Sequence, residues 1–124
     1  MLKLVFVGML TALIGLSSHA GAQTKKGANG GMVVNSQGHP IEFVLKGQEL
    51  TFYLIDDGGT PLATKGLKGR AVVQDGGKTV TVVLQPAAPN MLVGKAEAQI
   101  GAKARVVFSA SVPGHALTAR YVTE

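Results

Sequence analysis

A repeated alternation between short β-branched runs and turn-forming residues limits this chain to few kinds of fold. From about residue 30 onward, runs rich in Val, Ile, Thr, Phe and Leu are separated by Gly, Pro, Asn and Asp at intervals of roughly ten residues, a spacing typical of an all-β sandwich or a closed sheet. No window of helical length shows the apolar period of an α-helix. The pattern therefore predicts strands at 31–35, 39–46, 49–56, 70–74, 78–85, 91–96, 103–112 and 117–122.

Apolar and polar side chains alternate within these runs. Because successive side chains of a strand point to opposite faces, alternate apolar residues predict one buried face. Two such faces packed together predict an immunoglobulin-like antiparallel β-sandwich of about seven or eight strands, which usually takes roughly 100 residues. The residues expected to face the core are Ile41, Phe43, Leu45, Leu50, Phe52, Leu54, Val80, Val82, Leu84, Ala104, Val106, Phe108, Ala110, Val112, Leu117, Ala119 and Tyr121.

The N-terminal residues have the form of a secretory signal peptide. A short basic start precedes an apolar run over 4–16, and Ala20-Gly21-Ala22 has the small-x-small form of a cleavage site. The run is shorter than the about 20 residues needed to cross a bilayer, although an uncleaved anchor is the alternative. We therefore expect a signal peptide at 1–22, a flexible mature N-terminus at 23–29 and a single β-sandwich domain at 30–124. The mature protein is then periplasmic or secreted, without stable membrane insertion.

Composition excludes several kinds of site. The chain has no cysteine, so disulfides, thiolate metal sites and cysteine nucleophiles are ruled out. The predicted mature chain has 124 − 22 = 102 residues and, without Lys3, 12 − 1 = 11 Lys and Arg against 7 Asp and Glu. The basic residues are scattered, with Lys25-Lys26 the only adjacent pair, whereas nucleic-acid surfaces show clusters and stacking aromatics. We therefore expect no nucleic-acid partner.

Residues with site-like chemistry gather in one stretch, 27–45. There Gly30 and Gly31 open one predicted strand, and His39 with the nearby Glu42 opens the next. Imidazole and carboxylate are metal ligands, but an i, i+3 pair on a straight strand points to opposite faces. Convergence therefore requires a kink at Pro40 or a position for His39 in the loop before the strand. The structural alternatives are an exposed turn residue for His39 and a solvated strand position for Glu42.

Catalytic motifs are absent from the sequence. The three aspartates lie in predicted hairpin turns, where they usually bond the backbone, and no nucleophile elbow, phosphate-binding loop or His-Glu-x-x-His motif occurs. We therefore expect a protein that is not an enzyme. A copper site of Met32, His39 and Met91 is a further alternative, because thioether and imidazole bind monovalent copper, although methionines on strands more often fill gaps.

Short motifs across the mature region resemble a family of small exported bacterial proteins of uncharacterised function. Members open with His-Gly-Gly-x-Val-Val, continue to a His-x-Val-Glu-Leu-Val strand and then to Leu-x-x-Tyr-Leu-x-Asp-x-x-Gly-x-Pro. The matching residues here are 30–34, 38–44 and 50–56, followed by Gly59 and Pro61. Similar opening stretches occur in periplasmic proteins and domains associated with heavy-metal efflux.

The resemblance implies an exported β-sandwich that binds copper or zinc through the opening histidine, His39 and Glu42. Its partner would be an efflux component or another envelope protein. In this chain, however, Asn29 stands at the position of the opening histidine, and Pro40 stands where relatives often carry a second imidazole. Asparagine is a poor ligand for copper or zinc, so the implied function is an accessory or binding protein with a weakened metal site. The alternative is a structural or protein-interaction module with no metal role, in which an exposed sheet edge recruits a partner strand.

Overall fold

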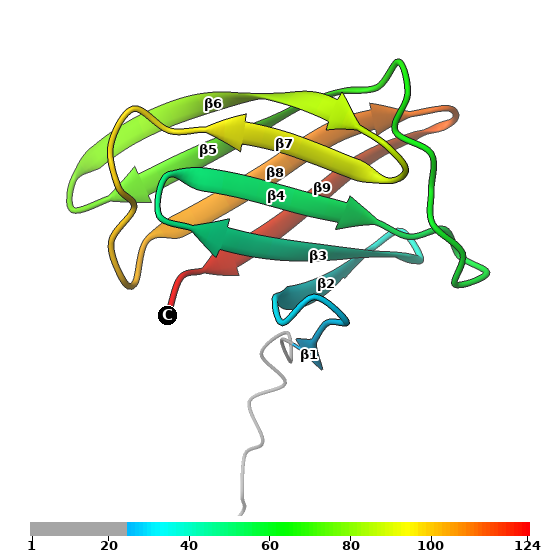
Figure 1. The fold of residues 1–124 in the computed structure, drawn as a ribbon, viewed down its shortest axis with the longest axis horizontal. Coiled ribbons are helices and arrows are strands. Elements are labelled where there is room, and N and C mark those ends of the chain that lie inside the picture. Colours follow the sequence, from blue (N-terminus) through cyan, green and yellow to red (C-terminus); the bar gives the residue numbers. More distant parts are fainter. Residues whose placement is uncertain (1–24) are drawn as a thin grey trace, which may run out of the picture.

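Nine antiparallel strands form one curled sheet in the computed structural model, which describes residues 25–124 (Figure 1). Along the sheet the strands are ordered β1-β2-β3-β4-β7-β6-β5-β8-β9. The predicted all-β fold is confirmed; the signal peptide expected at 1–22 lies outside the described residues. In chain order the strands are β1 (Lys25–Lys26), β2 (Met32–Ser36), β3 (His39–Lys46), β4 (Glu49–Leu54), β5 (Lys68–Asp75), β6 (Lys78–Ala87), β7 (Met91–Lys95), β8 (Arg105–Val112) and β9 (His115–Val122).

The strand ends differ from the predicted ones where the backbone turns. The predicted strand 103–112 begins instead at Arg105, because Lys103 has a φ of 62° and turns the chain. The last strand begins at His115, two residues earlier than predicted, because Val112 pairs with His115 across a two-residue turn. Gly114 in that turn has a φ of 80°, which glycine adopts without strain.

The core lies between the two halves of the curled sheet. In Figure 1, β3, β4 and β7 lie in front of β5, β8 and β9. Phe52 of β4 stacks on Phe108 of β8 with 4.5 Å between ring centroids, and Phe43 stacks on Phe52 at 4.9 Å. All three rings are buried, as alternation predicts. Val80 is an exception: it was expected in the core but is 41% exposed.

The halves of the sheet are continuous through the pairing of β6 with β7. A sandwich, and specifically an immunoglobulin-like one, stays a prediction. Within residues 25–124, no helix is long and apolar enough to cross a membrane.

The curl brings β9, at one end of the sheet order, beside β2. Three side-chain hydrogen bonds join them and neighbouring residues: Thr118 N to Ser36 Oγ at 3.0 Å, Gln37 Nε2 to the Ala116 carbonyl at 2.9 Å, and Tyr121 Oη to the Ile41 carbonyl at 2.7 Å. Among the described residues β9 has a backbone ladder only with β8. The junction between β2 and β9, called the seam below, is therefore closed by side chains.

Candidate functional site

The stretch that carries the predicted site folds back on itself. The loop between β1 and β2 crosses the outer side of β3, tightened by hydrogen bonds from Gly27 N to the Gly31 carbonyl (2.8 Å) and from Gly30 N to the Gly27 carbonyl (3.1 Å). Gly30 has a φ of 77°, which allows this tight turn. As a result the amides of this loop point toward β3.

Glu42 receives those amides. Its side chain is only 2% exposed, although it points away from the core formed by its neighbours. Asn29 N donates to Oε2 at 2.9 Å and to Oε1 at 3.2 Å, Asn29 Nδ2 donates to Oε1 at 2.9 Å, and Gly31 N donates to Oε2 at 2.7 Å. We call this arrangement of Gly27, Asn29, Gly31 and Glu42 the carboxylate clamp.

The clamp resembles a backbone nest, in which successive amides form a concavity for an anion. Here the anion is supplied by the chain's own Glu42. A Cβ on Gly27 would overlap the Glu42 carboxyl group, so the loop can approach this closely only with glycine there. Both carboxyl oxygens already accept hydrogen bonds, and a metal ion at Glu42 would have to compete with those donors.

The three predicted metal residues are only partly brought together. Asn29 contacts Glu42 directly, but it does so as a hydrogen-bond donor. His39 makes different contacts: its Nδ1 lies 3.3 Å from the Ile55 carbonyl oxygen, and its ring lies 5.7 Å from the ring of His115. Among residues 25–124, no group of three or more His, Cys, Asp or Glu side chains is placed to hold a metal ion.

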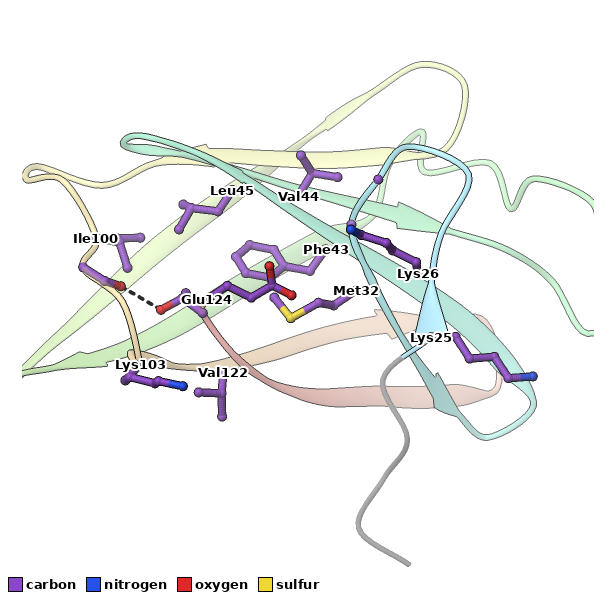
Figure 2. A pocket seen from close by; sticks show the side chains of 14 residues that line it. Lys25, Lys26, Met32, Phe43, Val44, Leu45, Ile100, Lys103, Val122 and Glu124 are labelled. Atoms are coloured by element: carbon purple, nitrogen blue, oxygen red, sulfur yellow. Dashed lines mark hydrogen bonds between the residues drawn. The ribbon is translucent and has the colours of Figure 1, made fainter.

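A pocket of about 750 Å³ opens at the other end of the seam, beyond the bonds that tie β9 to β2 (Figure 2). Its basic residues are Lys25, Lys26 and Lys103, and Glu124 is its one acidic residue. The rest of the lining is mainly apolar or glycine. Gly30 and Gly31 of the β1–β2 loop also line it, so the clamp forms one wall of the pocket. The other lining residues are Met32, Phe43, Val44, Leu45, Ile100, Gly101, Val122 and Thr123.

Sequence reasoning missed this seam pocket. Lys103 is far from Lys25 and Lys26 in the chain, and only the curl of the sheet brings them to one cavity. The adjacent pair Lys25-Lys26 was the available signal, but it falls in a segment expected to be flexible. Met32 of the alternative copper site also lines this pocket, whereas Met91 is paired with Tyr53 on β4.

Tyr121 closes the floor of the seam and gives a pH-dependent readout of it. Burial raises the pKa of its phenol well above the ordinary value of 10.0, and the negative charge of Glu42 raises it further. Because the pKa is raised in the folded state, the unfolded chain loses this proton at a lower pH than the folded chain does. The contribution of Tyr121 to the free energy of unfolding is therefore complete below about pH 10 and declines as pH rises above it.

We therefore expect a Tyr53→Phe variant, in which Tyr121 is the only tyrosine, to form phenolate only as it unfolds in alkali. The absorbance of phenolate and the far-UV circular dichroism should change together above pH 10. Phenolate formation near pH 10 with an unchanged dichroism spectrum would contradict the buried position of Tyr121. In a Tyr121→Phe variant, the alkaline loss of stability due to this group should disappear.

No protein-family model, curated protein or solved structure matches this chain. The family suggested by the short motifs therefore stays a prediction.

Proposed function

We propose that this chain is an exported, non-enzymatic binding protein whose seam pocket takes an extended, acidic segment of an envelope protein partner. One observation carries the proposal: within residues 25–124, the edge of β9 at Val122 has no backbone partner and opens into a pocket that also contains three lysines. Export rests on the leader sequence at 1–22, and the partner class rests on the chemistry of the pocket.

The free edge belongs to β9. In a strand, the N–H and C=O of alternate residues point to the same side. Thr118 N points toward the seam, where it bonds Ser36, whereas Thr123 points toward the β8 side, where it bonds Lys103 and Ala104. Val122 therefore presents its N–H and C=O to the seam. Among the described residues neither group has a backbone partner there.

Charge favours an acidic occupant. Lys25, Lys26 and Lys103 line the pocket against the single acidic residue Glu124. Two arginines, Arg105 of β8 and Arg120 of β9, lie near Val122 on the adjoining strands. An extended segment paired with Val122 would place alternate side chains on the lysines and on the apolar lining.

The test uses acetyl-Val-Glu-Val-Glu-Val-amide as a model of such a segment, with the same peptide carrying lysine in place of glutamate as its control. We expect the acidic peptide to bind, to shift the Val122 amide resonance and to protect that amide from hydrogen exchange. Equal binding of the lysine peptide, or binding without protection of Val122, would contradict strand addition at β9.

Charge reversal tests the role of the lysines. We expect Lys25→Glu, Lys26→Glu and Lys103→Glu together to weaken binding of the acidic peptide about tenfold at low salt, because each exposed ion pair contributes roughly 0.2–1 kcal/mol. The matched control reverses Lys46, Lys65 and Lys78, which do not line the seam pocket and whose reversal changes the net charge equally. Similar weakening in both triple variants would assign the effect to net charge and overturn the seam as the binding surface.

A further inference from the structure

We propose that His39 and His115 together bind one divalent transition-metal ion, Zn²⁺ or Cu²⁺, as a pair of imidazole ligands at the closed end of the seam. This site is separate from the seam pocket and does not depend on what that pocket binds. The proposed site keeps His39 from the sequence prediction, but its second ligand is His115 of β9 and not Asn29 or Glu42.

The two histidines come together from opposite ends of the domain. His39 begins β3 and His115 begins β9, 115 − 39 = 76 positions apart. Their ring centroids lie 5.7 Å apart with a tilt of 57° between the rings. The chain has three histidines, and the third, His19, falls in the predicted signal peptide. The fold thus brings together both histidines of the predicted mature protein.

The separation fits a shared ion. Zinc binds imidazole nitrogen at roughly 2.0–2.1 Å, so with about 1 Å more to each ring centre, two rings at a tetrahedral angle have centroids about 5 Å apart, and about 6 Å at wider angles. The observed 5.7 Å lies between these values. The tilt also excludes a flat stack of the two rings, which would leave no room for an ion between their nitrogens.

A second contact prepares His39 as a ligand. Its Nδ1 lies 3.3 Å from the Ile55 carbonyl oxygen, which can only accept a hydrogen bond. The tautomer assigned from this contact carries its proton on Nδ1 and leaves Nε2 with a free lone pair. Histidines that bind metals commonly donate their other ring N–H to a backbone carbonyl in this way, which fixes the ring and its tautomer.

Negative charge lies beside the pair. Asp56 directly follows Ile55, whose carbonyl oxygen lies 3.3 Å from His39 Nδ1. Asp57 lies beside the turn that precedes His39, since a Cβ on Gly38 would be 3.9 Å from the Asp57 Cβ. These carboxylates favour a cation at the histidines without serving as its ligands.

Two protein ligands leave the remaining coordination positions to water or to a group from a partner. The affinity is therefore lower than that of sites with three or four protein ligands, and such a site suits transfer of an ion better than its permanent storage. A role in metal handling at the envelope would rest on this pair.

The test titrates the protein, purified without a histidine tag, with Zn²⁺ and Cu²⁺ by calorimetry while the imidazole resonances are followed by NMR. We expect one ion per chain, micromolar to sub-millimolar affinity, and shifts of both imidazoles. His115→Ala, at an exposed position, and His39→Ala should each weaken binding at least about tenfold. Gln37→Ala is the control, because it removes the bond to Ala116 in the same region and leaves both imidazoles.

The proposal is overturned by the absence of saturable binding up to millimolar metal, by two independent ions per chain, or by a His115→Ala variant that binds as well as the unmodified protein. Circular dichroism of each variant establishes that it is folded. Should His39→Ala fail to fold, His115→Ala alone decides the outcome.

Discussion

A Glu42→Ala variant is expected to lose about 3 kcal/mol of its free energy of unfolding. Truncation removes the acceptor for Gly31 N, which is buried, and for Asn29 N, which is partly buried. Each buried donor left without a partner costs roughly 1–3 kcal/mol. For a domain of this size, that loss lowers the melting temperature by about 12 °C or more.

Urea denaturation and thermal melts of Glu42→Ala beside Glu49→Ala measure this effect. Glu49 is an exposed glutamate on β4, so its removal should change stability by no more than about 0.5 kcal/mol. The stability of Glu42→Gln should lie between those of the two alanine variants. The Gln amide keeps one oxygen as an acceptor, but its NH₂ group is a donor and faces the N–H donors of the loop. Equal stability of the Glu42 and Glu49 variants would show that the clamp contributes nothing to the fold.

The strands were predictable because their signals are local. The period of two in Val106, Phe108 and Ala110 identified a buried face of β8, and the structure buries all three. The predicted strand 39–46 coincides with β3, because a glycine turn bounds it on each side. Such features depend only on residues that are neighbours in the chain, so they can be predicted from a single sequence.

The environment of Glu42 was not predictable in the same way. Alternation correctly placed Glu42 on the outer face of β3, where the expected alternative was a solvated position. Glu42 is buried by a loop 11 to 13 residues earlier in the chain. No periodic pattern in the sequence predicts that this loop folds back over β3. The family motif points to Asn29 as a metal-site position, whereas in the structure Asn29 donates a hydrogen bond to Glu42. The pairing of His39 with His115 likewise depends on the curl of the whole sheet.

The clamp also links stability to the proposed binding surface. Gly31 donates to Glu42 and lines the seam pocket, and the loop that contains it follows directly from Lys25 and Lys26. Loss of the clamp would release the strand that holds two of the three lysines. A Glu42 variant that remains folded should therefore bind the acidic peptide less tightly, while the histidine pair keeps its affinity for metal.

A Gly31→Ala variant is expected to lose about 3 kcal/mol or more of its free energy of unfolding, which is the upper end of the usual destabilisation by overpacking. A Cβ at this position would overlap the carbonyl oxygen of Phe43 and would lie 2.7 Å from Val44 Cγ2. Phe43 is paired with Met32, the residue next to Gly31, so the carbonyl cannot withdraw without disturbing the β2–β3 ladder. Any shift of the loop also lengthens the bond from Gly31 N to Glu42.

Gly30→Ala is the matched control, one residue away in the same loop. A Cβ there meets nothing within 4 Å, so its cost comes from the φ of 77° alone, about 1–2 kcal/mol for a residue other than glycine. Urea denaturation should therefore rank Gly31→Ala well below Gly30→Ala in stability. The reverse order would mean that the turn at Gly30, and not the close approach of the loop to β3, limits which residues this stretch can hold.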